Sequence, residues 1–226
     1  MHYLRCQKPH RKRYASRQQR RGTLKNRVGI EHRPAVVDAR ARIGDWEGDT
    51  VIGGDRKGAL LTLVERKSRY TLAHPRRSKH SAGVTQAIVG LLRPHNKACK
   101  TLTFDNGKEF AGHEFIASCL KAKVFFAHPY CSWQRGLNEN TNGLLRQFFP
   151  KKRSLLTVIK NQVEQAVCWL NHRPRKCLGC RTPHEVFFNL YEVGLGYLYR
   201  HFTTATRWGI EFLRRGWHLT PIDHHR

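Results

Sequence analysis

Apolar and polar positions alternate along the chain in a way that predicts a mixed α/β domain starting near residue 43. Short runs rich in apolar and β-branched residues are typical of strands, and polar turn residues bound each of them. The first three follow one another closely enough to be hairpin-linked, whereas the last two stand apart. Strands are expected at Trp46–Ile52, Ala59–Val64, Arg69–Ala73, Lys100–Phe104 and Val124–Ala127.

Apolar residues at helical spacing separate and follow the later strands. Helices are expected over residues 84–92 before Pro94, over 115–120, through Glu139, and along a stripe from Leu155 to Leu170 that stops before Pro174. The predicted order is three strands, then helix, strand, helix, strand, helix and a further helix. This order implies a mixed five-stranded sheet flanked by helices on both faces, which is α/β and is the order of the ribonuclease H-like fold.

The charge of the chain points to a polyanionic partner. The 226 residues contain 42 Lys and Arg against 16 Asp and Glu, a formal net charge of +26. Nucleic acid is the first candidate and an anionic membrane surface the second. No apolar run of roughly 18 residues predicts a spanning helix, and no apolar segment follows the basic N-terminus as in a secretory signal. We therefore expect a bacterial protein that is cytoplasmic and associated with the nucleoid, with no membrane partner.

The chain divides into three parts by composition. Residues 1–42 hold 13 basic and two acidic side chains and are predicted to be an arm that grips phosphates, the alternative being a solvated tail without a dedicated partner. Residues 43–189 form the predicted α/β core, and residues 190–226 a divergent tail. The seven Cys show no disulfide framework, and Cys177 and Cys180 lack the second pair that a structural zinc site needs. Reduced and mostly buried thiols are expected.

Three carboxylates lie where such a sheet could gather them. Asp49 lies within the first predicted strand, Asp105 ends the fourth, and Glu139 lies on the helix after the fifth. Hard carboxylate oxygens suit Mg²⁺, and two such ions can activate the attacking oxygen and stabilise the leaving oxygen at a phosphodiester. Side chains alternate along a strand, so Glu47 shares the face of Asp49. The alternative is that each acid has no catalytic role and is a surface or capping residue.

Three sequence blocks resemble the insertion-sequence-thirty family of bacterial transposases. They are Trp46-Glu47-Gly48-Asp49, residues 103–110 around Asp105, and residues 135–151 around Glu139. The likeness runs from about residue 43 to 189 and includes His128-Pro129-Tyr130 and residues 171–176. The family has a retroviral-integrase-like core, so the resemblance implies that Asp49, Asp105 and Glu139 are its catalytic and metal-binding triad. It also implies Mg²⁺ or Mn²⁺, two ions in all, with element ends and target DNA as partners of a homo-oligomer.

Further residues are candidates for DNA contacts or for supporting roles. Arg135, Asn142 and Arg146 share one helical face with Glu139, and an ordinary solvated face is the alternative for the two Arg. Basic residues in the signature blocks and just beyond them complete the predicted DNA-binding set: Lys108, Lys151 and Lys152. Trp46 is expected in the core, Gly107 in a turn with positive φ, and His128 either at the substrate or as a structural side chain.

The leading hypothesis is a transposase that catalyses metal-dependent DNA strand cleavage and strand transfer. One alternative is a ribonuclease H-like nuclease that cuts but never joins, and another is a catalytically inactive DNA-binding remnant. Complete family members carry a helix-turn-helix region before the core, and no pair of apolar-periodic helices precedes residue 43 here. After about residue 190 the resemblance stops.

Overall fold

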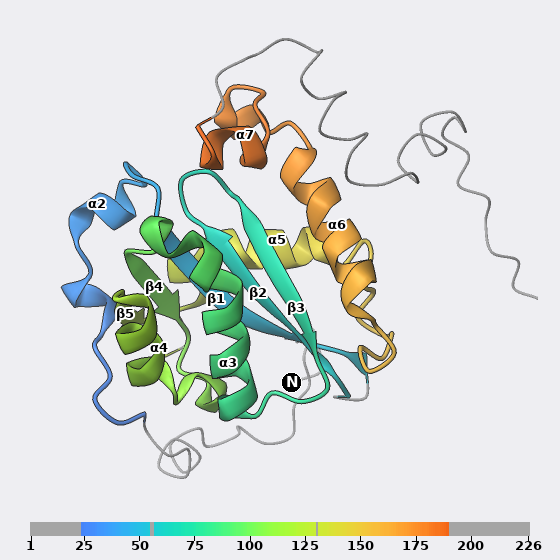
Figure 1. Ribbon diagram of the computed structural model, residues 1–226, viewed down its shortest axis with the longest axis horizontal. Helices are drawn as coiled ribbons and strands as arrows, with labels where there is room; N and C mark the ends of the chain where they lie inside the picture. Colours follow the sequence, from blue (N-terminus) through green and yellow to red (C-terminus); the bar gives the residue numbers. More distant parts are fainter. Residues whose placement is uncertain (1–23, 55–56, 130, 190–226) are drawn as a thin grey trace, which may run out of the picture. The chain divides into compact units, whose positions relative to one another are not determined.

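The computed structural model describes residues 24–54, 57–129 and 131–189. A single five-stranded sheet lies at the centre of this part of the chain (Figure 1). Its strands lie in the order β3-β2-β1-β4-β5, so the third strand along the chain is at one edge and the fifth at the other. The strands are β1 (Asp45–Ile52), β2 (Ala59–Glu65), β3 (Thr71–Arg76), β4 (Thr101–Phe104) and β5 (Lys123–Phe126).

The sheet is mixed because its two halves are connected differently. β1, β2 and β3 pair antiparallel, as expected for three hairpin-linked strands. β4 and β5 pair parallel to β1 and to each other, and helices provide the crossovers. The predicted fold class and the predicted order of strands and helices along the chain are confirmed, and each strand matches its predicted range to within about two or three residues. The largest difference is at β3, whose predicted first residue Arg69 has a φ of 66° in the preceding turn.

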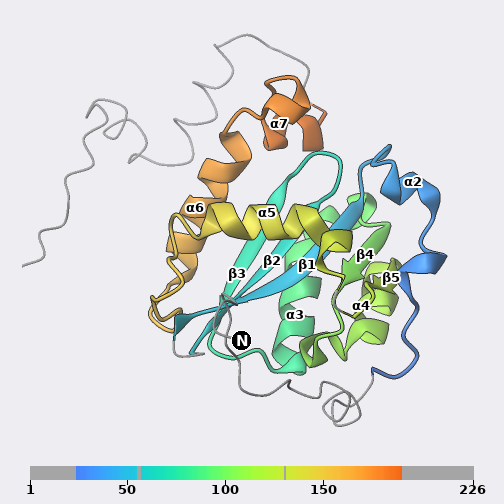
Figure 2. The same cartoon turned by 180° about the vertical axis from the view of Figure 1, so that it is seen from behind.

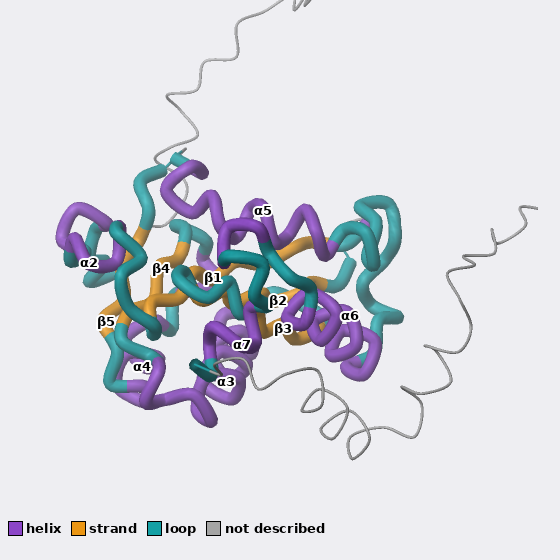
Figure 3. Tube along the Cα trace, turned by 90° about the horizontal axis from the view of Figure 1, so that it is seen from above, coloured by secondary structure: helices purple, strands orange, loops and turns teal. Residues whose placement is uncertain are grey.

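Helices cover both faces of the sheet. α3 (Ser81–Leu92) and α4 (His113–Leu120) lie on the face seen in Figure 1, and α5 (Gly136–Leu145) crosses the opposite face over β1 and β2, as Figure 2 shows. Viewed from above, the sheet lies between the α5 layer and the α3 and α4 layer (Figure 3). α6 (Lys160–His172) packs beside β3. Shorter helices complete the described part: η1 (Ile30–His32), α2 (Ala35–Asp38), η3 (Arg93–Ala98), η4 (Lys108–Phe110), η5 (Ser132–Arg135), η6 (Lys176–Leu178) and α7 (Pro183–Phe187).

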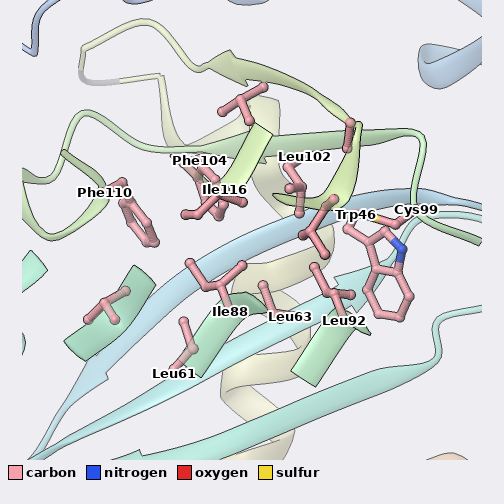
Figure 4. Packing of buried hydrophobic residues seen from close by; sticks show 14 of the residues in the cluster. Trp46, Leu61, Leu63, Ile88, Leu92, Cys99, Leu102, Phe104, Phe110 and Ile116 are labelled. Atoms are coloured by element: carbon pink, nitrogen blue, oxygen red, sulfur yellow. The ribbon is translucent and has the colours of Figure 1, made fainter. Parts of the chain in front are cut away.

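The main apolar core fills the space between the sheet and the α3 and α4 layer (Figure 4). Alternate residues of each strand contribute to it, as expected for a sheet with one apolar face. Trp46 is fully buried there, which confirms its prediction as a core residue. Other fully buried members of this core are Leu61, Leu63, Ile88, Leu92, Leu102, Phe104, Phe110 and Ile116.

Gly48 allows the closest packing within this core. A Cβ atom built on Gly48 would lie 2.4 Å from a ring carbon of Phe104 and 3.1 Å from a methyl carbon of Leu63. The Phe104 ring therefore packs directly against the β1 backbone, and no larger residue fits at position 48 without moving one of the two strands.

A second apolar cluster holds α5 and α6 against the opposite face near β2 and β3. Its members come from three strands, the two helices and the loop between them: Val51, Leu60, Ala73, Leu145, Phe149, Leu155, Val158, Val163, Ala166 and Leu170. The helical stripe predicted from Leu155 becomes regular only at Lys160, because residues 155–159 form the loop that enters α6. The same face is polar over β1 and β4.

Residues 24–42 of the predicted basic arm contact the core. Gly29 bridges to Phe126 of β5, and Val37 is fully buried. Arg33 is buried and donates to the hydroxyl of Thr103, while its guanidinium also pairs with Asp38. This half of the arm therefore contributes charged side chains to the folded unit. Residues 1–23 lie outside the described residues, as do Tyr130 and the predicted tail at 190–226.

Two local predictions are wrong. Gly107 has a φ of −68°, so the turn after β4 does not use positive φ there. The turn is held instead by the Asp105 side chain, which accepts a bond from the Gly107 N–H at 3.0 Å. The thiols are not mostly buried, because Cys99 is the one buried cysteine among the six in the described part of the chain, all of them free. Cys6 lies outside that part.

Candidate active site

Asp49 lies in β1 on the face covered by α5. Its neighbours Gly48 and Trp46 face the apolar core, and the alternation of the strand turns Asp49 and Glu47 to the other side. The Asp49 carboxylate accepts bonds from the Thr50 N–H at 2.9 Å and from the Asn142 side-chain amide at 2.8 Å. Burial is the main cause that raises the pKa of Asp49 above its ordinary value. Arg135 works against this shift, and the nearby Asp105 adds to it.

Asp105 follows the last residue of β4 and lies beside Asp49. The parallel pairing of β1 with β4 sets Glu47 opposite Thr103, and each aspartate comes two residues later on its strand. Adjacent strands are about 4.8 Å apart, so this register brings the two carboxylates to one edge of the site. The Asp105 side chain is 37% exposed and that of Asp49 is 24% exposed, so both are partly open to a ligand.

Arg135 joins the two aspartates. Its Nη1 lies 3.5 Å from Asp49 Oδ1 and its Nη2 lies 3.5 Å from Asp105 Oδ2. Nη1 also donates to the carbonyl oxygen of Gly48 at 3.2 Å. A single cation therefore lies between the two carboxylates, and only 11% of its side chain is exposed.

Polar contacts fix α5 on the sheet next to the aspartates. The buried Glu47 accepts a bond from the Asn138 N–H at 3.1 Å, which satisfies one of the free amides in the first turn of the helix. Thr62 faces Asp49 directly across β1 and β2, and its hydroxyl contacts the side-chain oxygens of Asn138 at 3.2 Å and Asn142 at 3.0 Å. The helix that carries Glu139 is thus positioned by hydrogen bonds rather than by apolar packing alone.

Glu139 is exposed in the first turn of α5. The buried stripe of that helix, formed by Leu137, Asn138, Thr141 and Leu145, is turned toward the sheet. Glu139 lies next to this stripe, one residue after Asn138 and three before Asn142, on the flank of the helix that reaches Asp49. Within the described residues, no three His, Cys, Asp or Glu side chains are gathered as metal ligands. The structure brings Asp49 and Asp105 together, and Glu139 is not gathered with them as a third metal ligand.

The predicted DNA-contact residues fall into two groups. Asn142 bonds to Asp49 and Thr62, and Arg146 donates to the carbonyl oxygens of Ile52 at 2.8 Å and Phe149 at 3.4 Å. These side chains, like that of Arg135, are hydrogen-bonded to other residues of the chain in this structure. The second group is exposed and open to a polyanion: Lys108 on η4, and Lys151 and Lys152 in the loop after α5.

His128 and Gln134 lie together near the site. The Gln134 side chain accepts a bond from the His128 N–H at 2.8 Å, and the His128 ring lies 3.4 Å from a carboxylate oxygen of Glu31. These two residues help to line a cavity of about 360 Å³ with Glu31, Arg33, Asp38 and Arg66. His128 therefore has protein partners at a half-exposed position.

Sequence reasoning missed several residues that support the aspartates. Thr62 could have been found, because it is the polar residue in the otherwise apolar run Ala59–Val64 and points to the polar face. Glu109 accepts a bond from the Thr50 hydroxyl at 2.7 Å and so supports the residue after Asp49. The contact of Arg66 with Glu47 is buried and gave no signal in the sequence.

The donor set fits a magnesium ion. Mg²⁺ in enzymes is commonly held by one or two carboxylates while substrate phosphate and water fill the other positions. Asp49 and Asp105 provide such a pair, and the Arg135 guanidinium between them shows that a cation is accommodated there. Their partial exposure leaves room for substrate oxygens.

Known structures have the same fold. The catalytic core domain of BIV integrase has a TM-score of 0.53 at 19% identity, and the match covers 66% of this chain and 95% of that domain. A chain of the simian T-cell lymphotropic virus intasome in complex with PP2A regulatory subunit B56 gamma has a TM-score of 0.52 at 21% identity, covering 67% of this chain and 57% of that one. The described fold is that of an integrase catalytic core, within the ribonuclease H-like α/β class.

Sequence comparison gives the family. The transposase for insertion sequence element IS4351 of Bacteroides fragilis is 43% identical over 185 residues, 82% of this chain and 57% of that protein. Transposase InsI for element IS30A of Escherichia coli strain K12 is 38% identical over 195 residues, 82% of this chain and 51% of that protein. The predicted resemblance to the insertion-sequence-thirty family of transposases is confirmed, since these relatives match about four fifths of this chain. It spans about half the length of the curated relatives it matches, and no family model matches it.

Membrane association through a spanning helix has no support in the described residues, since none of their helices is both long and apolar enough to cross a bilayer.

Proposed function

We propose that this chain is the catalytic portion of a transposase that cleaves DNA strands and transfers them with the help of a divalent metal ion. The observation that carries the proposal is the meeting of Asp49 and Asp105 on one cation at the edge of an integrase-like sheet. The net charge of +26 supports a polyanionic substrate, and relatives over most of the chain are transposases.

Asp49 and Asp105 would hold the metal ion, and Mg²⁺ or Mn²⁺ suits their hard oxygens. Glu139 would complete a second site after a movement of its side chain or of the first turn of α5. When bound, the ions would neutralise charge on the scissile phosphate and favour in-line attack and departure of oxygen. Asn142, Thr62 and Glu47 would position this set, because they join α5 to the strand of Asp49.

The reaction consists of two displacements at phosphorus. In the first, a water oxygen attacks the phosphate, and the bond to the 3′-oxygen breaks, which leaves a 3′-hydroxyl and a 5′-phosphate. In the second, that 3′-hydroxyl attacks a target phosphate and displaces its 3′-oxygen, so one phosphodiester replaces another.

The exposed Lys108, Lys151 and Lys152 would bind backbone phosphates beside the site. Arg135 and Arg146 would add contacts after exchange of their protein partners. Two element ends would require at least two copies of the chain on DNA.

The proposal is tested by a strand-transfer assay. Purified protein is mixed with a labelled duplex carrying a 3′-hydroxyl end, a supercoiled plasmid, and Mg²⁺ or Mn²⁺. Label joined to plasmid is expected with the unaltered protein and not with Glu139→Gln. Glu114→Gln is the matched control, since Glu114 is an exposed acid on α4 whose carboxylate accepts a bond from Asn26 at 2.8 Å, outside the site.

The other outcomes select the alternative functions. Nicked plasmid without joined label would contradict strand transfer and favour a ribonuclease H-like nuclease. Binding to DNA without any metal-dependent product would contradict catalysis and favour a DNA-binding remnant. Activity of Glu139→Gln equal to that of Glu114→Gln would remove Glu139 from the catalytic set.

A further inference from the structure

Arg135 occupies an unusual place for a basic residue in a protein that binds a polyanion. Its guanidinium reaches inward to both aspartates, whereas Lys108, Lys151 and Lys152 are exposed. Both contacts are 3.5 Å long, compared with about 2.7–2.9 Å for a good charge-assisted hydrogen bond. Its Nε is buried and makes no hydrogen bond. Nη1 also donates to the Gly48 carbonyl oxygen at 3.2 Å, so it is the contacts with the two aspartates that rest on charge more than on short hydrogen bonds.

The charges around Arg135 explain why it lies there. Two partly buried carboxylates close together repel each other, and this repulsion contributes to the raised pKa of Asp49. Arg135 is the cation that opposes it. A divalent ion would satisfy the same two carboxylates more completely, but it would need oxygen distances of about 2.0–2.1 Å and would repel a guanidinium that is in contact with the same atoms. Arg135 and a divalent ion therefore compete for Asp49 and Asp105.

The position of Arg135 in the chain allows it to leave. It is the last residue of η5 and the residue that precedes α5, with φ −125° and ψ 34°, so it lies at a junction between two helical segments. Gly136 follows it, and a Cβ at that glycine would meet no atom within 4 Å. The backbone next to Arg135 therefore has open space on the side of the missing Gly136 Cβ. A guanidinium binds phosphate with two parallel hydrogen bonds, so a DNA phosphate at the site offers Arg135 a better partner than either aspartate.

We propose that Arg135 couples DNA binding to metal binding by acting as an internal cation that holds Asp49 and Asp105 together until a DNA phosphate takes it. In the free protein Arg135 lowers the affinity of the aspartates for a divalent ion. When a DNA phosphate binds the Arg135 guanidinium, the guanidinium leaves Asp49 and Asp105, and the two carboxylates can then bind the ion. Because such coupling is reciprocal, a bound ion also strengthens DNA binding. The inference rests on the proposed function for its DNA step, but its metal step is independent of catalysis.

The measurement is Mn²⁺ affinity, determined by titration calorimetry at constant ionic strength, for the unaltered protein and for Arg135→Gln. Without DNA, Arg135→Gln should bind Mn²⁺ about tenfold more tightly, within the range usual for coupled sites. Arg93→Gln is the charge-matched control, since Arg93 is an exposed residue at the end of α3 on the other side of the sheet, and it should leave the affinity unchanged. Asp105→Asn should reduce binding in every background, which shows that the titrated site is the aspartate pair.

A saturating duplex with a 3′-hydroxyl end tests the coupling. It should raise the Mn²⁺ affinity of the unaltered protein toward that of Arg135→Gln and should change the affinity of Arg135→Gln little. Arg135→Lys keeps the charge without the planar guanidinium and should behave much like the unaltered protein in the absence of DNA. Arg135→Lys also provides the test if Arg135→Gln unfolds. Lys binds a phosphate through a single point charge, so DNA should raise the Mn²⁺ affinity of Arg135→Lys less than that of the unaltered protein.

Equal Mn²⁺ affinity of the unaltered protein, Arg135→Gln and Arg93→Gln would overturn the proposal. Weaker binding by Arg135→Gln would also overturn it, since Arg135 would then support the metal site instead of competing for it. Tighter binding by Arg135→Gln in a protein that performs no strand transfer would leave the inference standing while the proposed function fails.

Discussion

The two faces of the sheet have different chemistry although the same strands build them. On the α3 and α4 face, Trp46, Leu63 and Phe104 pack into an apolar core. On the α5 face, the neighbouring residues Glu47, Thr62 and Thr103 are also buried, yet each is polar and hydrogen-bonded. One face therefore supplies most of the apolar stabilisation, which leaves the other free to hold charges that cost stability.

The sharpest test of this division is Asp105→Asn. Strand transfer should fall by on the order of a hundredfold or more, since even indirect changes around a metal site cost about 10–100-fold. The melting temperature without metal should change little, because the side chain is partly exposed and lies outside the apolar core. Strand-transfer yield and thermal unfolding measure the two effects. A large loss of stability would show that the polar face also holds the fold together.

Leu63→Ala tests the opposite face. The side chain is fully buried between the sheet and α3, so its truncation should lower the free energy of unfolding by about 2–5 kcal/mol. Chemical denaturation measures this loss. Mn²⁺ affinity of the remaining folded molecules should be unchanged. Weakened metal binding at full folding would mean that the apolar core tunes the site directly.

Thr62→Val changes the polar face without changing its volume much. The hydroxyl contacts Asn138 and Asn142, so its loss should cost about 1–3 kcal/mol, the usual price of leaving buried polar groups unpaired. Strand transfer should fall as well, because Asn142 also bonds to Asp49. Thr62→Ser keeps the hydroxyl and is the control in both thermal unfolding and strand transfer. Equal behaviour of the Val and Ser variants would contradict a positioning role for Thr62.

Cys99 has an effect that appears only at high pH, and burial in the apolar core is its main cause. Burial raises its thiol pKa from 9.0 to about 12. Below the thiol pKa of the unfolded chain, the Cys99 thiol is neutral in both the folded and the unfolded protein. Its contribution to the free energy of unfolding is fully present in that pH range. Between pH 9 and pH 12 the unfolded chain ionises first, so stability falls as the pH rises. Cys99→Ala should therefore lose less stability than the unaltered protein between pH 9 and pH 12. Chemical denaturation at a series of pH values measures this, and the same dependence of the free energy of unfolding on pH in both proteins would contradict the prediction.

Thiol alkylation of the native protein at mild pH provides a second readout. The exposed Cys119, Cys168, Cys177 and Cys180 should react before Cys99 does. Mass spectrometry of the modified chain identifies the order. Early modification of Cys99 would show that the apolar face opens without global unfolding.

Much of the fold could be predicted from the sequence because it depends on short-range patterns. Alternation of apolar residues predicts all five strands, and their connections imply the parallel pairing that sets Asp49 beside Asp105. Two errors came from local geometry. Arg69 adopts a positive φ, which is uncommon for residues other than glycine. Gly107 has a negative φ, and its turn is held by the Asp105 carboxylate, which accepts a bond from the Gly107 N–H.

The site was predictable only in part, because its details depend on where long side chains point. The sequence indicates that Arg135 and Asn142 share the helical face of Glu139, but not that both turn to the aspartates while Glu139 remains exposed. It also gives no sign that Arg33, in the predicted arm, is buried beside Thr103. Side-chain orientation of this kind is decided by tertiary charge balance, for which one sequence carries little information.

Gly48 has a consequence for anyone who screens this protein by random mutagenesis. Gly48 lies on β1 next to Asp49. The ring of Phe104, the residue just before Asp105, fills the space where a side chain at position 48 would be, and the Gly48 carbonyl oxygen accepts a bond from Arg135. A substitution there would shift both acids at once. Position 48 should therefore score as essential in a survey of transposition-defective alleles, and a geneticist reading such a map would find a glycine ranked among the acids although it contacts no substrate.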